Sequence, residues 1–447
     1  NHKHLPCRTV LGLYAFLMSL TMFLPLALAQ AAAHDVALVP WTNLALLCLW
    51  EMERGLKPAM RTRWMAAAAC MIALAILTKA LIGIAIVGIG FGTFLIVSRS
   101  VSIGSCLRVA IVFTFGVVMA SPWFIAMEIR NNGYLYYYFI ERHVLGFATS
   151  GQPHGRAPWY YYAPFVTLGA MPWIWYLVPL LRDEWNDRKA SSESRPAVLL
   201  LVAWFLGGFF FLCTAKSKLA TYALPLFPAI SILSAVSWRR MSENLLSAVS
   251  KRWFGNMCRS AGFVGVAAPF AVLLLCQFLL KTDFPGISWL IAAAISATSA
   301  ATWMAFNARD YNNAVALLSV WVAGITCLAM TWPLQIFAEN YSERNLAEWI
   351  NKQQAVPRHV VLVGEKPGSV IFYLDHSLRE QLQLDQMERM TLEELPANDD
   401  LADNVVLAVT QSMVEEARLK QLPIPGHLTH STGQFHIFEP GTASASS

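Results

Sequence analysis

The sequence predicts an all-α polytopic membrane protein that carries a small α/β domain at its C-terminal end. The chain of 447 residues is 56% hydrophobic and only 14% charged, whereas soluble domains are about 25% charged. Apolar segments long enough to cross a bilayer recur as far as residue 333. From about residue 338 the sequence turns polar, and short strand patterns alternate with helix patterns.

Eleven segments are apolar enough to form membrane-spanning helices. A span needs about 20 apolar residues, because hydrocarbon offers no partner to an unpaired backbone amide. None of the eleven contains Asp, Glu, Lys or Arg. The predicted spans are 9–30, 36–50, 64–78, 80–97, 109–127, 159–181, 197–214, 219–237, 260–280, 286–306 and 313–333.

The apolar stretch 64–97 is too long for a single span. Lys79 lies in its middle, and an ammonium group there must reach water. The sequence therefore predicts a helical hairpin that turns at Thr78 and Lys79.

The loop cations predict an orientation. With a cytoplasmic N-terminus, eighteen lysines and arginines fall in loops on the cytoplasmic side and seven on the other, as the positive-inside rule requires. The loop 128–158 and the C-terminal domain are therefore predicted to lie outside the cytoplasm. Net charge of +5 reflects this topology and gives no reason to expect nucleic acid as a partner.

The expected organisation is a transmembrane domain over 1–337, an α/β domain over 338–440 and a disordered tail over 441–447. The eight cysteines lie in spans or near the cytoplasmic side, so neither a disulfide framework nor a zinc-binding spacing is indicated. Within the α/β domain, the pattern predicts a helix over 342–354, strands over 359–364 and 404–409, a helix over 410–421 and a strand pair through 427–438.

Polar groups gather at one predicted face of the membrane, while the midplane has none. Ion-coupled transporters usually place ionisable groups at that depth. Cations at the outer lipid–water boundary suit a substrate with a phosphate head and a hydrocarbon tail. The groups at this face are Asp35, Lys79, the loop 128–162, the turn Lys216-Ser217-Lys218, and Lys281 with Asp283.

Each of these groups also has a structural interpretation. Most tyrosines of the loop fit an interfacial aromatic belt, and Lys79 and Lys281 fit cations that extend to the membrane surface. A carboxylate at the edge of a span, such as Asp35, is as often structural as catalytic. Their concentration at one face is what favours a site.

Five sequence motifs resemble the bacterial aminoarabinose transferase family. This family is one of the polyprenyl-phosphate-dependent glycosyltransferases related to protein O-mannosyltransferases. The resemblance covers about residues 9–333, and KSKLATYALP is its most specific part. The motifs are LTKALIG at 77–83, FIERHVLGFAT at 139–149, PWYYYAP at 158–164, MPW at 171–173 and FLCTAKSKLATYALPLFPAISIL at 211–233.

The resemblance implies a GT-C type fold in the bacterial inner membrane, with the active site, the loop 128–158 and the C-terminal domain in the periplasm. It also implies a sugar donor carried on undecaprenyl phosphate. The sugar would be 4-amino-4-deoxy-L-arabinose, and the acceptor would be lipid A or another envelope glycan. It further implies that a region bearing a first acidic residue precedes Asn1. A divalent cation is the one cofactor implied, and the other partners are membrane lipids.

The resemblance also suggests roles for particular residues. Where the family has a Leu-Asp-Pro triplet this chain has Leu38-Val39-Pro40, so Asp35 is the candidate catalytic carboxylate. Gly146 replaces a frequent arginine, whose charge Arg142 or Arg156 would supply. The expected donor-phosphate ligands are Lys216, Lys218, Arg156 and Lys79, the substrate-site aromatics are Tyr160 and Tyr222, and the residue near a metal is His143.

Breaking a sugar–phosphate bond leaves an anionic polyprenyl phosphate, which nearby cations stabilise in the transition state. A phosphate acceptor needs no general base, whereas a hydroxyl acceptor would use a carboxylate such as Asp35. Three functions remain open at this point: a lipid-linked glycosyltransferase acting on an envelope glycan, a protein O-mannosyltransferase-like enzyme, and a flippase or transporter of lipid carriers.

Overall fold

The structure is a computed structural model in which contacts divide the chain into two compact units. One unit comprises residues 1–271 and 287–327, and the other comprises 272–286 and 328–447. The predicted domain boundary at residue 337 stays a prediction. The structure describes residues 7–29, 34–54, 57–145, 157–186, 195–216, 218–281, 283–336, 342–353, 359–363, 365, 367–381, 387–395 and 405–439.

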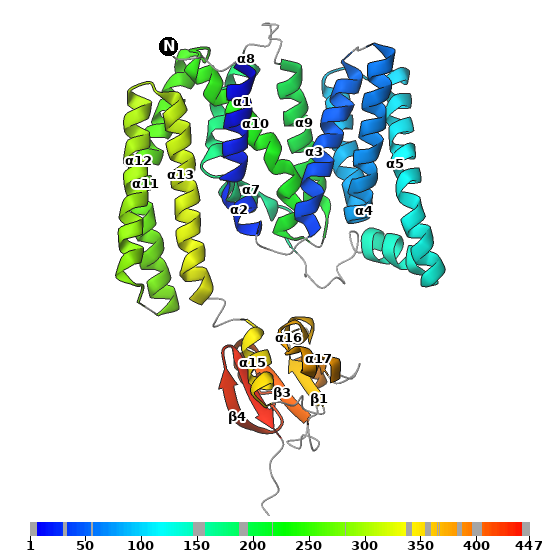
Figure 1. Ribbon diagram of the computed structural model, residues 1–447, viewed down its shortest axis with the longest axis vertical. Coiled ribbons are helices and arrows are strands. Elements are labelled where there is room, and N and C mark those ends of the chain that lie inside the picture. Colours follow the sequence, from blue (N-terminus) through cyan, green and yellow to red (C-terminus); the bar gives the residue numbers. More distant parts are fainter. Residues whose placement is uncertain are drawn as a thin grey trace, which may run out of the picture. The chain divides into compact units, whose positions relative to one another are not determined.

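Helices make up the described chain as far as residue 336, because apolar segments can satisfy their backbone amides in lipid only within helices. Figure 1 shows the longer of these helices running roughly parallel or antiparallel to one another. They are α1 Cys7–Leu20, α2 Phe23–Leu28, α3 His34–Glu53, α4 Pro58–Val97, α5 Ile103–Arg130, η1 Tyr136–Leu145, α7 Tyr162–Gly169, η2 Trp173–Tyr176, α8 Leu177–Asn186, α9 Arg195–Thr214, η3 Ala220–Leu226, α10 Phe227–Ser242, α11 Ala248–Leu280, α12 Gly286–Asn307 and α13 Tyr311–Thr331.

Within the described residues, seven helices are long and apolar enough to cross a membrane. The bent pair formed by α7 with η2 and α8 would make an eighth. The polytopic membrane class is therefore confirmed, but the predicted count of eleven spans is not. The count differs partly because α1 is short and α3 falls outside this set, and partly because α4 is counted as one helix although it doubles back.

α4 is a helical hairpin rather than one straight helix of 40 residues. Lys79 (φ −151°, ψ 36°) and Ala80 (φ 42°, ψ −124°) leave the helical backbone region. A Cβ placed on Gly83 would lie 2.8 Å from the carbonyl oxygen of Ala75, whereas eight residues of straight helix would separate them by about 12 Å. The predicted helical hairpin is therefore confirmed, with its turn at Lys79 and Ala80 rather than at Thr78 and Lys79, and its two arms run antiparallel in Figure 1.

Replacing Gly83 with alanine should weaken this hairpin, because the added methyl group meets a backbone carbonyl that cannot rotate away. We expect the free energy of unfolding to fall by about 1–3 kcal/mol, measured by thermal unfolding in detergent. Gly92→Ala is the matched control, since a Cβ there meets nothing within 4 Å in the same helix. Equal melting temperatures for the two variants would contradict the close approach of the arms.

The predicted span 159–181 is wrong as a straight helix. α7 and the following η2–α8 segment are bent by 88°. Pro172 lies at the bend and has no amide hydrogen with which to continue α7. Gly169 brings α7 close to α2, since a Cβ there would lie 2.4 Å from the Cβ of Leu24. The predicted span 9–30 is likewise divided, into α1 and α2.

The C-terminal end of α3 is fastened to α5. Arg108 donates from Nε and Nη2 to the two carboxylate oxygens of Glu53, at 2.8 and 2.6 Å. The hydroxyl of Ser105 donates to Glu53 as well, at 3.0 Å. A two-pronged pairing of guanidinium with carboxylate fixes direction as well as distance. This contact holds one end of α3 in a defined position.

The C-terminal domain is an α/β fold around a five-stranded sheet of order β2-β1-β3-β5-β4. β2, β1 and β3 are parallel, while β5 pairs antiparallel with β3 and with β4. Its elements are α15 Arg344–Gln353, β1 His359–Val363, α16 Pro367–Tyr373, α17 His376–Gln381, β2 Met387–Met390, η4 Leu392–Glu394, β3 Val405–Thr410, α18 Gln411–Lys420, β4 His427–Thr432 and β5 Phe435–Glu439.

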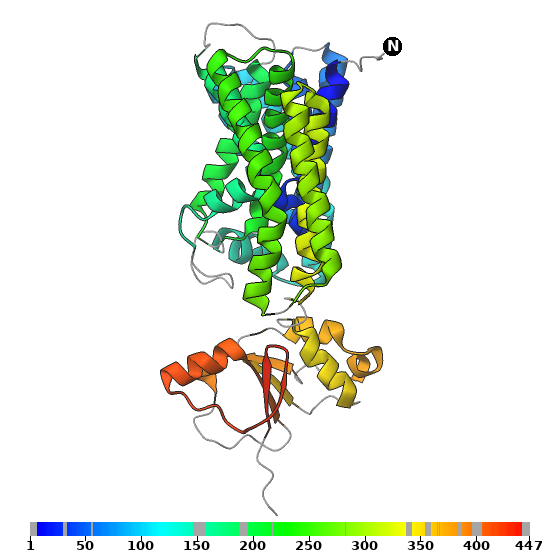
Figure 2. The same ribbon diagram turned by 90° about the vertical axis from the view of Figure 1, so that its left-hand side faces the viewer.

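Alternation along the strands builds two cores, one on each face of this sheet. Val360 and Leu362 of β1 pack with α15, α16 and α17, whereas Val361 and Val363 pack with α18. Figure 2 shows α18 on one side of the sheet and the other helices on the opposite side. The two predicted helices and four predicted strands are confirmed. Four short elements of three to seven residues are additions: α16, α17, β2 and η4.

Candidate functional site

Three elements that are far apart in the sequence bring polar side chains together at one end of the helical unit. Asp35 lies in the first turn of α3, and Lys79 lies at the tip of the α4 hairpin. Thr221 and Tyr222 lie in the short helix η3 that precedes α10. Three predicted site residues, Asp35, Lys79 and Tyr222, therefore meet in one cluster.

The contacts within this cluster are direct. Lys79 Nζ forms an ion pair and hydrogen bond with Asp35 Oδ1. Thr221 Oγ1 donates to the other carboxylate oxygen, Asp35 Oδ2, at 2.6 Å. The ammonium of Lys79 also lies 3.8 Å from the ring centroid of Tyr222. Both oxygens of Asp35 are thus occupied, and the charge of Lys79 is shared between a carboxylate and an aromatic face.

Burial makes these contacts obligatory. The side chains of Lys79 and Asp35 are only 9% and 5% exposed. An isolated charge in such surroundings is strongly disfavoured, and a paired charge is tolerated when its remaining hydrogen-bonding groups are satisfied. The arrangement positions the Tyr222 ring, because a cation holds its face and the neighbouring Thr221 is fixed to Asp35.

The two lysines of the predicted phosphate-binding turn differ sharply. Lys218 is buried, and its ammonium donates to the backbone carbonyls of Ala215 and, at 3.2 Å, of Ala157. Lys216 is exposed, and its own carbonyl accepts from Ala157 N at 3.4 Å. Lys218 therefore holds the turn against the segment that leads to α7, whereas Lys216 presents its charge at the surface.

The aromatic residues near α7 also differ in how far they are exposed to solvent. Tyr160 and Trp159 are exposed, and their rings meet edge to face with centroids 5.8 Å apart. Tyr162 is fully buried and lies beside Tyr222 and the backbone of Leu219. The structure thus adds Tyr162 and Thr221 to the site. For Thr221 the sequence offered a signal, its place beside Tyr222 in the most specific motif, whereas nothing in the sequence separated Tyr162 from its neighbours.

Part of the predicted site lies outside the described residues. Arg156 belongs to this part, and so do the side chains of His143 and Arg142, although η1 contains both of these residues. Among the residues that the structure describes, no group of three or more His, Cys, Asp or Glu could hold a metal ion. A divalent cation near His143 stays a prediction.

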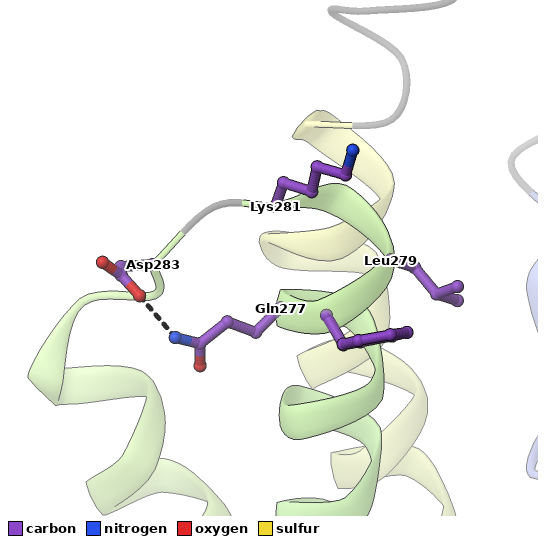
Figure 3. Close-up of a pocket in the computed structure, with 5 residues that line it drawn as sticks. Gln277, Leu279, Lys281 and Asp283 are labelled. Carbon is purple, nitrogen blue, oxygen red and sulfur yellow. Dashed lines mark hydrogen bonds between the residues drawn. The ribbon is translucent and has the colours of Figure 1, made fainter.

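Lys281 and Asp283, the remaining polar pair expected at the outer face, line a separate pocket at the turn between α11 and α12. Gln277 Nε2 donates to Asp283 Oδ1 there, while the side chain of Lys281 points away from this bond (Figure 3). The pocket, of about 590 Å³, is lined by Gln277, Phe278, Leu279, Lys281 and Asp283. It belongs to the second compact unit, whereas the Asp35 cluster belongs to the first.

The geometry defines a membrane protein with a buried ion pair, an aromatic ring and an exposed cation at one end of a helical bundle. Two solved structures share this fold. The crystal structure of ArnT from Cupriavidus metallidurans bound to undecaprenyl phosphate has a TM-score of 0.66 and 18% identity, covering 98% of this chain and 81% of that one. The apo structure of the same protein has a TM-score of 0.64 and 19% identity, covering 97% and 79%.

Curated relatives carry the corresponding name. The undecaprenyl phosphate-alpha-4-amino-4-deoxy-L-arabinose arabinosyl transferase of Aeromonas salmonicida is 30% identical over 266 residues, which cover 58% of this chain and 46% of the relative. The protein of that name from Pectobacterium atrosepticum is 31% identical over 282 residues, covering 55% and 49%. The chain spans about half the length of these relatives. No protein-family model matches it. The resemblance to aminoarabinose transferases that the motifs suggested is confirmed.

Replacing Asp35 with asparagine should leave Lys79 buried without its counter-charge. We expect a loss of about 3 kcal/mol in the free energy of unfolding, a magnitude typical of a broken buried pair, measured by thermal unfolding in detergent. The double variant Asp35→Asn with Lys79→Met removes both charges and should recover most of this loss. Equal destabilisation of the single and double variants would contradict the pairing.

Proposed function

We propose that this chain is a membrane glycosyltransferase that moves a sugar from a polyprenyl phosphate to an acceptor in the bacterial envelope. By analogy with its relatives, the donor is undecaprenyl phosphate carrying 4-amino-4-deoxy-L-arabinose, and the acceptor is lipid A. The observation that carries the proposal is the cluster in which Asp35 and Lys79 contact Thr221 and Tyr222. Thr221 and Tyr222 follow the turn Lys216-Ser217-Lys218 in the motif that most resembles these transferases.

The reaction chemistry matches this arrangement. When the sugar leaves, negative charge grows on the phosphate oxygens of the carrier. A cation and a hydroxyl donor held near those oxygens stabilise the transition state more than the ground state. Lys216, exposed next to the segment leading to α7, supplies the cation. Tyr222, whose ring is fixed from one face by Lys79, supplies the hydroxyl.

Asp35 then acts through its neighbours. Both of its oxygens accept hydrogen bonds, from Lys79 and from Thr221. These bonds stabilise the ionised carboxylate, which makes it a weak general base toward an acceptor hydroxyl. Lipid A phosphate is already an anionic nucleophile at neutral pH and needs no base. The proposed role of Asp35 is therefore to position Tyr222, and a direct catalytic role stays a prediction from the resemblance.

Transfer itself can be measured with the protein in lipid vesicles, a donor labelled in its sugar and lipid A as acceptor. We expect label to move from donor to acceptor. Movement of intact donor between leaflets without bond cleavage would instead indicate a lipid-carrier flippase. Label on a protein hydroxyl rather than on lipid A would indicate the O-mannosyltransferase-like reaction.

The lysine turn gives a sharper test. Lys216→Ala should raise the KM for the donor about tenfold, the loss of roughly 1.4 kcal/mol expected when one charge-assisted contact is removed, with little change in melting temperature. Lys218→Ala should mainly lower the melting temperature, because it removes the donors to Ala157 and Ala215. An unchanged KM in Lys216→Ala would remove Lys216 from the donor site.

We also propose that the site and the C-terminal domain face the periplasm. The asymmetry of eighteen against seven loop cations supports this orientation. Alkaline phosphatase, which is active only outside the cytoplasm, should be active when fused after Pro440. Green fluorescent protein fused at the same position should stay dark, because it does not fold into its fluorescent form when it is exported across the membrane as an unfolded chain. The opposite pair of results would reverse the orientation and the location of the site.

A further inference from the structure

A polar pocket of about 400 Å³ lies at the end of α10 that is farther from the proposed site. The polar cluster meets η3, just before α10 begins, whereas the pocket meets the last turn of α10, about 24 Å away along a helix of 16 residues. The start of α1 and the turn between α12 and α13 complete its walls, and Figure 1 shows both at the same end of the helical unit. The walls include Val10, Arg239, Glu243, Arg309, Asp310 and Asn312.

The turn between α12 and α13 holds two of these residues in fixed positions. Arg309 has a left-handed backbone (φ 61°), and its amide donates to the Phe306 carbonyl at 3.0 Å. The amide of Asp310 donates to the Ala305 carbonyl at 2.9 Å, and this pair of bonds closes the end of α12. The Asp310 carboxylate then accepts from the backbone and side-chain amides of Asn313, at 3.3 and 2.6 Å. The chain's own bonds thus order this wall, which lowers the cost of binding a ligand there.

The pocket carries separated charges that balance. On the α10 wall, Arg239 Nε donates to Glu243 Oε1 at 2.9 Å. On the opposite wall Arg309 and Asp310 are neighbours, and among the residues that the structure describes no carboxylate lies within 4 Å of the Arg309 guanidinium. Two cations and two carboxylates around one space are complementary to a neutral ligand that itself carries both an anion and a cation.

An apolar face of α1 continues from the pocket. Tyr14 is buried, and its hydroxyl donates to Asn312 Oδ1, which fastens α1 to the start of α13. Leu13 lies one turn beyond Val10 and is 47% exposed. Exposed apolar residues recur along the same side of the helix at the spacing of Leu13, Phe16 and Leu20. A polar pocket next to an exposed apolar face at the end of membrane-spanning helices suits an amphipathic ligand.

We propose that this pocket binds the headgroup of a zwitterionic membrane phospholipid, one with a phosphodiester and a primary ammonium, as in phosphatidylethanolamine. Arg309 and Arg239 bind the phosphodiester, because a guanidinium can donate two parallel hydrogen bonds to a phosphate. Asp310 and Glu243 accept hydrogen bonds from the ammonium. The acyl chains lie along the exposed face of α1. A bound lipid therefore joins α1, α10 and the α12–α13 turn, at a site separate from the transfer reaction.

The headgroup preference can be measured with the protein in detergent and three lipids that share two octanoyl chains. Binding is followed through the rise in melting temperature as each lipid is added. We expect phosphatidylethanolamine to bind about tenfold more tightly than phosphatidylcholine, whose ammonium has no hydrogen to donate to a carboxylate. Phosphatidylglycerol has no ammonium, so it should also bind more weakly than phosphatidylethanolamine.

Three variants assign the effect to the pocket. Arg309→Gln should weaken phosphatidylethanolamine binding about tenfold, the effect of one charge-assisted hydrogen bond. Arg252→Gln is the matched control, since it removes the same charge from an exposed position of α11, and it should leave binding unchanged. Asp310→Asn keeps a residue that caps a helix equally well. It should bring the affinity for phosphatidylethanolamine close to that for phosphatidylcholine.

Equal binding of the three lipids, or tighter binding of phosphatidylglycerol, would overturn the assignment. Equal losses in Arg309→Gln and Arg252→Gln would do the same. Glycerophosphoethanolamine has the headgroup without acyl chains and should bind more weakly than the lipid; binding as tight as that of the lipid would identify a soluble ligand instead. If Arg309→Gln does not fold, Asp310→Asn decides, because an unchanged preference for phosphatidylethanolamine over phosphatidylcholine would overturn the assignment. Sugar transfer enters none of these measurements, so their outcome is independent of the proposed function.

Discussion

A lysine buried within a bundle of apolar helices dictates how the polar end of this structure is assembled. Lys79 interrupts a long apolar stretch, and its ammonium cannot remain in that environment without a counter-charge. The hairpin tip of α4 therefore meets the first turn of α3, where Asp35 lies. The second oxygen of that carboxylate then fixes Thr221, and with it the helix η3 that carries Tyr222. One electrostatic requirement thus orders three segments that the apolar contacts alone would leave less defined.

Two lysines that are separated by a single residue differ in burial and in the contacts of their ammonium groups. The ammonium of Lys218 donates to the backbone carbonyls of Ala157 and Ala215 and thereby closes the turn, while Lys216 is exposed at the surface. Either residue would satisfy a motif that asks only for basic character. The difference arises from the path of the backbone at Ala215 and Ala157, which brings two carbonyl groups within reach of one ammonium and not of the other.

Sequence patterns predicted features that depend on local composition and missed those that depend on packing. The turn at Lys79 was predictable because a charge is strongly disfavoured in hydrocarbon, although the expectation that its ammonium reaches water was wrong, since it is buried against Asp35. The strands β1 and β3 were predictable from their continuous apolar residues. The bend after α7 was not, since Gly169 and Pro172 act there only through contact with α2 and through a missing amide. The contacts of Asp35 were also beyond the sequence, because its partners lie 44 and 186 residues away.

The contact between Glu53 and Arg108 gains significance when both ends of α3 are considered. The helix is fastened at its first turn by Asp35 and at its last by Glu53, over 20 residues. Its rise is about 30 Å. Because one end pairs with the hairpin tip of α4 and the other with α5, α3 cannot tilt or slide without moving both of those helices. A shift of α5 is thus passed along α3 to its first turn, which carries Asp35.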